Sequence, residues 1–316
     1  MKLVVVGPGA LGCLLAARLH LAGTCHVQLL DHRPQRAAAL NRQGIILEEP
    51  GAAPSPPLPI PVTTDPGGII HADTAVFCVK SFTLPQALAS AKPFATPKTI
   101  FIAFANGIGH LEEMRRLSDC CLPVLGICTA GATLLAPGRV RVGGQGSLTL
   151  GYAVNPATPA GPAGPNGAAP LLPIAQAFRQ AGFDTRLSND IDRELWYKLL
   201  VNVGINALTV LHDCPNGRLL EIPAARRLMA QAVSEAAAVA EASGISLNIE
   251  PLAMVEEVCR RTATNISSML QDIRHHRPTE IMAINGEIVR RANILGMTAP
   301  ANEELTITVK QRHPSQ

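Results

Sequence analysis

The sequence predicts an α/β domain built on a parallel sheet, followed by an all-helical domain. Three observations lead to this prediction: a glycine-rich turn at residues 7–12, short apolar runs of strand length through residues 1–189, and long helical periodicity through residues 190–316. A chain of 316 residues is long for a single core and suits two domains. We therefore expect one domain at residues 1–189 and a second at residues 190–316.

The N-terminal segment has the pattern of a strand, a helix and a second strand. Lys2–Val6 is rich in β-branched residues, and Leu11–Ala22 has helical character that stops at Gly23. His26–Leu30 is again an apolar run of strand length. Together they make a unit of about thirty residues, the size of one βαβ crossover.

Further short apolar runs continue the predicted sheet: Ala75–Val79, Ile100–Phe104 and Val124–Cys128. Such strands, separated by helical segments, are typical of a parallel sheet that is covered on both faces. Val140–Val142 and Ser147–Leu150 predict a late hairpin around the glycines between them.

Two stretches rich in Pro, Gly and Ala, Pro50–Pro66 and Asn155–Pro173, are expected to be surface loops. After the second stretch the strand signal fades, and from about Asp190 the periodicity is helical.

Composition limits the class of partner. Apolar residues make up 47% of the chain and the mean hydropathy is +0.20, but no run is long enough to span a membrane. The net charge is +3, without a basic run, and only 3% of residues are aromatic, so we expect no nucleic-acid partner. The eight cysteines lack metal-binding spacing and suit reduced thiols in a cytoplasmic protein.

The pattern G-x-G-x-x-G lies between the first predicted strand and the first predicted helix. Its residues are Gly7, Pro8, Gly9, Ala10, Leu11 and Gly12. The first glycine permits a tight turn, the second lets a pyrophosphate approach the backbone, and the third lets helix and strand pack closely. A glycine-rich turn without a ligand is the alternative. The strand–turn–helix context favours a dinucleotide site, with the phosphates at the helix N-terminus.

The end of the second predicted strand carries mixed signals about the cofactor. Asp31 follows the strand, and an acidic residue there usually accepts a hydrogen bond from the free ribose of NAD. Arg33 and Arg36 follow closely, and an arginine there usually binds the 2′-phosphate of NADP. The spacing leaves both cofactors open, and solvated arginines at a helix start are the plainer interpretation.

Lys80 and Asn106 each follow a predicted strand. Ligands of open α/β sheets bind outside the carboxyl ends of the strands, so both side chains are candidates for cofactor contact. The alternatives are a surface charge at Lys80 and a simple Asn-Gly turn at Asn106.

Lys198, Asn202 and Asn206 recur every fourth residue in an otherwise apolar helical stretch, ELWYKLLVNVGINALT. This spacing puts them on one helix face. A lysine can polarise a carbonyl oxygen and supply its proton as hydride arrives from a nicotinamide, while amides one turn away hold other oxygens of the substrate. A snorkelling lysine is the alternative. Gly204, in the same stretch, suggests that another element or a ligand approaches closely.

Taken together, these motifs resemble those of the ketopantoate reductase (2-dehydropantoate 2-reductase) family. The similar segments are GPGALG at residues 7–12, Ala105-Asn106-Gly107, RELWYKLLVNVGINALT, Cys214-Pro215-Asn216-Gly217 and TATNISSMLQDIRHHRPTEIMAINGEIVRRA. The resemblance implies a Rossmann-type dinucleotide-binding domain and a C-terminal helical domain like that of 6-phosphogluconate dehydrogenase, with the site in the cleft between them.

The resemblance also implies roles for individual residues. Lys198 matches the proton donor, and Glu280 matches an acidic residue that helps to hold substrate and cofactor. The positions that hold the substrate are Asn106, Asn202, Asn206, Asn216 and Ser268. Lys80, Ala132 and again Asn106 match positions that contact the cofactor. The implied reaction is NADPH-dependent reduction of ketopantoate in pantothenate and coenzyme A biosynthesis.

Other interpretations stay open. Asp31 weakens the expectation of NADPH, so NADH is not excluded. The same fold could reduce another small 2-keto acid, or bind a dinucleotide as a sensor without turnover. The presence of a proton donor together with its amide partners argues against the sensor. Assembly as a homodimer is compatible with the sequence, which does not determine the oligomeric state.

Overall fold

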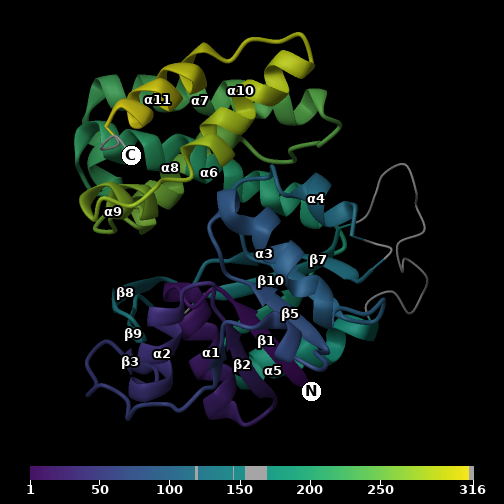
Figure 1. Cartoon of the computed structure of the whole chain (residues 1–316). Coiled ribbons are helices and arrows are strands. Elements are labelled where there is room, and N and C mark those ends of the chain that lie inside the picture. Colours follow the sequence, from purple (N-terminus) through teal and green to yellow (C-terminus); the bar gives the residue numbers. More distant parts are fainter. Residues whose placement is uncertain (118–119, 145, 154–168, 313–316) are drawn as a thin grey trace. The chain divides into compact units, whose positions relative to one another are not determined.

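The computed structural model describes residues 1–117, 120–144, 146–153 and 169–312. Contacts divide the chain into two compact units, drawn in Figure 1. The first unit is Met1–Ala105 with His110–Ile191, and the second is Asn106–Gly109 with Asp192–Gln316. The chain thus passes briefly into the second unit directly after a strand of the first.

The first unit contains an eight-stranded sheet in the order β11-β10-β7-β6-β5-β1-β2-β4. The strands are β1 Lys2–Val6, β2 His26–Leu30, β4 Val62–Thr63, β5 Thr74–Phe77, β6 Ile100–Ala103, β7 Leu122–Cys128, β10 Ser147–Tyr152 and β11 Asp184–Leu187. All neighbouring strands are parallel except β10 and β7, which are antiparallel. The predicted α/β fold is confirmed, with this one antiparallel pair added.

The hairpin predicted around residues 143–146 is wrong. Its two strands exist, but β9 (Arg139–Val142) belongs to a second sheet of order β3-β9-β8, with β3 at Ile46–Glu48 and β8 at Ala132–Ala136. The real hairpin joins β8 to β9 through Pro137-Gly138. Gly138 has a φ of 76°, which a glycine adopts at no steric cost. The Pro-Gly pair between two short strands is therefore the sequence signal for the hairpin that the prediction overlooked.

The helices of the first unit are α1 Ala10–Ala22, α2 Pro34–Gln43, α3 Leu84–Ala91, α4 Leu111–Arg115 and α5 Leu172–Gln180, with short 3₁₀ turns η1 Pro66–Gly68, η2 Ser81–Thr83, η3 Lys92–Phe94 and η4 Ala169–Leu171. Of these, α1 contributes most to the core, because seven of its thirteen residues are buried. The expected loop 155–173 lies outside the described residues up to 168. From Ala169 onward it is helical, and Pro173 is tolerated in the first turn of α5.

The second unit is helical, as predicted, and Figure 1 shows helices joined by short loops. Its elements are α6 Ile191–His212, η5 Asn216–Glu221, α7 Pro223–Ala242, α8 Pro251–Arg261, α9 Ser268–Arg274, η6 Ile281–Ala283, α10 Asn285–Ile294 and α11 Pro300–Gln311. Gly204 of α6 is explained by packing. A side chain there would come within 2.7 Å of Val255 and 2.9 Å of Val233, so the glycine lets α7 and α8 approach.

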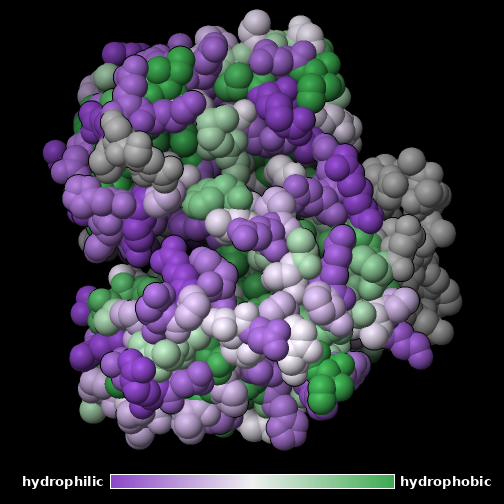
Figure 2. Space-filling view, viewed as in Figure 1, coloured by the Kyte–Doolittle hydropathy of each residue, from purple (hydrophilic) through white to green (hydrophobic). Residues whose placement is uncertain are grey.

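A buried polar network joins the helices of the second unit. The Asn285 side chain donates to Oδ1 of Asn302 at 3.0 Å, and Asn302 donates to Glu235 Oε2 at 2.8 Å. Hydrogen bonds between these side chains specify how the helices pack, while Oδ1 of Asn285 is buried without a hydrogen-bond partner among the described residues. On the face of each unit seen in Figure 2, hydrophilic residues predominate and hydrophobic residues form small patches. Among the described residues, no helix is long and apolar enough to cross a membrane.

Candidate functional site

The order of the strands marks the ligand-binding edge of the first unit. From β1 the chain moves to β2 on one side and later returns to place β5 on the other side of β1. Ligands of open α/β sheets bind at such a switch point, outside the carboxyl ends of the strands. The segment after β1 is the glycine turn, and the segment after β5 is Cys78-Val79-Lys80.

The three glycines of the turn differ in how much space the fold leaves for a side chain. Gly7 has a φ of 93°, and a Cβ there would lie 2.5 Å from Cγ1 of Val79. A Cβ on Gly12 would overlap the carbonyl oxygen of Gly7. The fold therefore requires Gly7 and Gly12. A Cβ on Gly9 would meet nothing closer than 3.9 Å, so folding leaves the space above Gly9 open.

The N-terminus of α1 suits an anion. Its N-cap residue is Gly9, whose lack of a side chain leaves the first N–H groups without a side-chain cap, and the first turn holds no acidic residue. Exposed N–H groups and the helix dipole favour phosphate at such an end. The open space above Gly9 and this uncapped helix end fit the pyrophosphate of a dinucleotide.

Asp31, at the end of β2, lies in an ion pair. Its carboxylate accepts from Nε of Arg36 at 2.5 Å and from Nη2 of Arg36 at 2.6 Å. It also accepts from the backbone N–H of Arg33 at 3.1 Å. The Arg33 guanidinium is exposed and donates from Nε to Nε2 of His32 at 3.2 Å. Sequence reasoning named these residues but not the pairing of Asp31 with Arg36.

Two other predicted cofactor residues lie in the first unit. Lys80 is the half-buried N-cap residue of η2, and its carbonyl accepts from the Thr83 hydroxyl at 2.9 Å. Ala132 is half-buried at the start of β8. Their contact with a cofactor remains a prediction.

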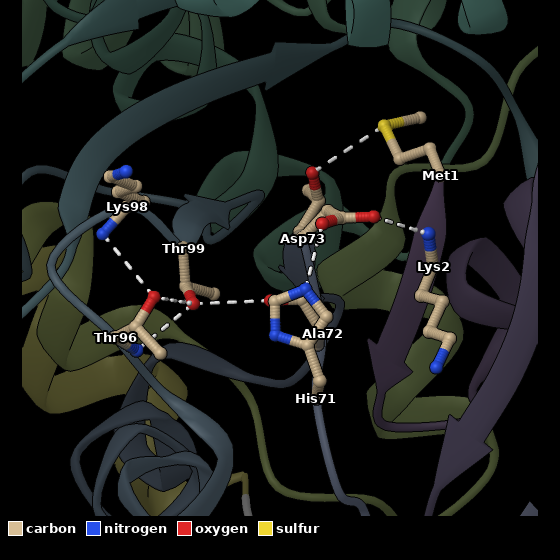
Figure 3. A network of polar contacts seen from close by, with 9 residues as sticks. Met1, Lys2, His71, Ala72, Asp73, Thr96, Lys98 and Thr99 are labelled. Carbon is tan, nitrogen blue, oxygen red and sulfur yellow. Dashed lines mark hydrogen bonds and ion pairs between the residues drawn. The ribbon is translucent and has the colours of Figure 1, made fainter.

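A groove of about 730 Å³ lies at the opposite, amino edge of the sheet and is lined by residues such as Lys2, His26 and His71. Figure 3 shows that polar groups at this edge bond to one another. The Asp73 carboxylate accepts from the Lys2 backbone N–H at 2.7 Å and contacts His71 at 2.9 Å. The hydrogen bond from Lys2 lowers the pKa of the Asp73 carboxyl. The polar groups of this edge thus bind one another and stabilise the fold. The edge lies away from the glycine turn.

In the second unit, Asn106 and Glu280 come together. The Asn106 amide donates to Oε2 of Glu280 at 2.8 Å. Glu280 is only 6% exposed and directly precedes η6, but its side chain makes no capping bond there. The carboxylate is therefore not a helix-start charge, because it is turned to Asn106 instead.

A glycine allows this pairing. Gly107 has a φ of 80°, and a Cβ there would overlap the carbonyl oxygen of Ala283 in η6. Gly109 lies close to the Glu287 carboxylate, which pairs with Arg290 and Arg291. The close contact of segment 106–109 with η6 therefore requires Gly107, whereas a Cβ on Gly109 would lie 3.6 Å from the Glu287 carboxylate, at ordinary contact distance.

The polar stripe lies on α6 as predicted. Lys198 and Asn202 are half-buried, and Asn206 is only 6% exposed. Two contacts show that α10 runs antiparallel beside α6. Asn285, at the start of α10, donates to the Val203 carbonyl at 3.5 Å. Arg291, near its end, lies 5.9 Å from the ring centroid of Trp196.

The remaining predicted substrate residues are linked through segment 262–268. Asn216 donates from Nδ2 to the Thr262 hydroxyl at 2.9 Å, while its Oδ1 is buried without a hydrogen-bond partner among the described residues. The Thr209 hydroxyl, one turn after Asn206, lies 2.6 Å from the Ser267 hydroxyl. Ser267 also caps α9, whose first residue is Ser268. Ser268 is exposed.

Comparison with known proteins identifies the family of this chain. Residues 3–155 match the family described as "Ketopantoate reductase PanE/ApbA", and residues 190–313 match its C-terminal counterpart. The chain belongs to the ketopantoate reductase family. A relative from Halobacterium salinarum named 2-dehydropantoate 2-reductase is 33% identical, over 98% of each chain.

Solved structures place the fold in the same group. The crystal structure of a PanE/ApbA family ketopantoate reductase from Ralstonia eutropha JMP134 is 28% identical, with a TM-score of 0.86, over 99% of this chain and 98% of that one. A D-mandelate dehydrogenase in complex with NADH and anilino(oxo)acetate is 25% identical, with a TM-score of 0.88 and the same coverage.

For this member of the ketopantoate reductase family, sequence reasoning missed Thr209 and Ser267. Thr209 continues the polar stripe at the next helical position, and its hydroxyl also donates to the Asn206 carbonyl at 2.8 Å. Its place on the stripe was the available signal. For Ser267 the available signal was its place just before an apolar helical turn, where a serine is a typical N-cap.

Proposed function

We propose that this chain catalyses the NADPH-dependent reduction of 2-dehydropantoate (ketopantoate) to (R)-pantoate, a step of pantothenate and coenzyme A biosynthesis. The observation that carries the proposal is full-length similarity to relatives named 2-dehydropantoate 2-reductase. The geometry supports it, since a buried carboxylate (Glu280) and an amide (Asn106) meet at 2.8 Å in a unit that also carries the Lys198 stripe.

Lys198 is the proposed proton donor. A nicotinamide bound at the glycine turn would supply the hydride for the carbonyl carbon, and the carbonyl oxygen then requires one proton. The Lys198 ammonium polarises this oxygen and then donates a proton to it. The neutral Lys198 amine afterwards takes up a new proton from solvent. Product release then leaves the enzyme unchanged apart from the oxidised cofactor.

The substrate-holding residues of the proposal are Asn106, Asn202, Asn206, Asn216 and Ser268, with Glu280 accepting from the substrate hydroxyl. Amide and hydroxyl donors suit the carboxylate and hydroxyl oxygens of a small keto acid. The unpartnered Oδ1 of Asn216 is one acceptor that such a ligand could satisfy.

The proposed cofactor residues begin with the glycine turn, where Gly9 leaves room for the pyrophosphate. The set is Gly7, Pro8, Gly9, Ala10, Leu11, Gly12, Asp31, Arg33, Lys80, Asn106, Ala132 and Glu280. In functional terms we divide the chain into a cofactor domain at residues 1–189 and a substrate domain at residues 190–316.

A second candidate is reduction of another 2-keto acid with NADH. It is favoured by the likeness to the D-mandelate dehydrogenase that was solved with NADH. Steady-state assays at 340 nm with ketopantoate, against NADPH and NADH in turn, separate the two candidates. The first predicts the highest kcat/KM with ketopantoate and NADPH. A higher value with NADH or with another keto acid supports the second, and no oxidation with any keto acid supports a non-catalytic sensor.

A further inference from the structure

The Asp31 carboxylate is fully buried, since the exposed fraction of its side chain is 0%. Its backbone N–H donates to the Thr63 carbonyl at 3.0 Å, which fixes the residue between β2 and β4. Both carboxylate oxygens accept from Arg36, and Oδ1 also accepts from the Arg33 backbone. The carboxylate is therefore occupied before any ligand arrives.

An acidic residue that selects NAD does so by accepting hydrogen bonds from the adenosine ribose. Its oxygens must face the ligand for that purpose. In this chain a ribose hydroxyl could reach the Asp31 carboxylate only by displacing Arg36 from a bidentate ion pair. Such pairs are costly to break, since removing one partner leaves a buried charge uncompensated.

Arg36 has donors to spare. A guanidinium carries five N–H bonds, and Asp31 takes one from Nε and one from Nη2. The other three have no acceptor among the described residues. The Arg36 side chain is 20% exposed, so part of it reaches the surface where Arg33 and His32 are also exposed. Three basic side chains thus gather at the end of β2, around a carboxylate that is turned inward.

We infer that Asp31 is a positioning residue that favours NADPH. It holds the Arg36 guanidinium directly, and it fixes the backbone that carries the exposed Arg33 side chain, so that the two guanidinium groups receive the 2′-phosphate. It does not act as an acceptor for the ribose of NADH. This inference rests on the proposed function and reverses the usual meaning of an acid at this position.

The two possible roles of Asp31, positioning Arg36 or accepting from the ribose, predict opposite effects of one substitution on the preference between NADPH and NADH. Asp31→Asn keeps the shape of the side chain but removes the charge that holds Arg36. If Asp31 positions Arg36, the dissociation constant for NADPH rises by about tenfold or more, and that for NADH changes by less than about threefold. If Asp31 accepts from the ribose, NADH binding weakens, while NADPH binding is unchanged or improves.

Fluorescence titration of each dinucleotide measures these constants without turnover. Calorimetry with adenosine 2′,5′-bisphosphate and 5′-AMP isolates the 2′-phosphate, because the two ligands differ only in that group. Arg36→Ala should weaken binding of the bisphosphate and leave 5′-AMP binding unchanged. Arg42→Ala, which removes an exposed arginine of the same helix, is the matched control and should change neither.

A double-mutant cycle tests the coupling. In the Arg36→Ala background, Asp31→Asn should have little further effect on NADPH affinity, because the group that it positions is gone. Unchanged NADH affinity in each variant shows that the binding domain is folded.

The outcomes separate this inference from the function on which it rests. A parent enzyme that binds NADH as tightly as NADPH overturns the cofactor assignment, and the inference with it. A parent that prefers NADPH, with an Asp31→Asn variant that keeps or strengthens this preference, overturns the inference alone.

Discussion

The amide of Asn106 donates a hydrogen bond of 2.8 Å to the Glu280 carboxylate, across 174 residues of sequence. Asn106 lies three residues after β6, and Glu280 lies in the loop before η6. The close approach of Gly107 to Ala283 makes the bond possible. Neither residue type is unusual after a strand or before a helix, so their significance lies in the pairing.

Glu280→Ala should lower kcat/KM for ketopantoate by about tenfold or more, because loss of a charged hydrogen bond costs roughly 1.5–3 kcal/mol. Steady-state kinetics measure the change, and circular dichroism should show an intact fold. Glu241→Ala, which removes an exposed acid on α7, is the control. A variant that melts slightly lower but keeps its efficiency would assign Glu280 a structural role only.

Lys198→Ala should lower turnover by at least about a hundredfold, since general acid catalysis contributes roughly 10²–10⁴-fold. NADPH affinity should change little, because the phosphates are expected at the glycine turn. Lys198→Arg keeps the positive charge but cannot release a proton, so it should be nearly as inactive. Exposed Lys310→Ala serves as control. Near-parental turnover in Lys198→Ala would mean that the proton comes from another group or from water.

Gly9→Ala and Gly12→Ala should behave differently although both lie in one turn. Gly9 has a φ of −80°, and a methyl group there meets no atom of the fold closer than 3.9 Å. We expect Gly9→Ala to keep the parental Tm but to weaken NADPH binding. A methyl group on Gly12 overlaps the Gly7 carbonyl, so its variant should lose about 1–3 kcal/mol of stability. Equal melting temperatures for the two variants would contradict this division of roles.

Thr209→Val should raise the KM for ketopantoate and lower the free energy of unfolding by about 1–3 kcal/mol, because it leaves the buried Ser267 hydroxyl without this partner. The N-terminus of α9, where Ser268 lies, would then be less firmly placed. Thermal unfolding and steady-state kinetics measure the two effects. Thr264→Val, at an exposed position in the linking segment, is the control. An unchanged KM would show that Ser268 is positioned without Thr209.

Glu256 should make the stability of the second unit depend on pH. Its carboxylate accepts from Arg226 at 2.7 Å and from Arg260 at 2.9 Å. The hydrogen bond from Arg226, with the charges of both arginines, lowers the pKa of Glu256. A lowered folded-state pKa stabilises the fold above the unfolded pKa of about 4.3, and the effect is lost as the pH falls through the folded value.

Glu256→Gln should therefore have a lower Tm than the parent at pH 7, and the two melting curves should converge below about pH 4. Glu257→Gln is the matched control, because Glu257 is exposed and pairs only with Arg260, at 3.3 Å, among the described residues. A difference in Tm that persists at low pH would point to lost packing instead of lost charge.

Sequence alone predicted the parts of this protein that depend on local pattern. The segment β1-α1-β2 follows from apolar runs and glycines within thirty residues, and α6 with its polar stripe follows from helical periodicity. These features are recognisable because side-chain direction repeats with the backbone, every second residue in a strand and every three to four in a helix. The family resemblance rested on the same local segments.

Only the tertiary structure decided which distant groups pair. It placed β9 and β10 in different sheets, joined Asn106 to Glu280, linked Thr209 to Ser267, and turned Asp31 inward to Arg36. A strand signal does not name its partner, and a charged or polar residue does not reveal whether its bonds go to ligand or protein. Those outcomes depend on long-range packing, which brings together residues that no local period connects.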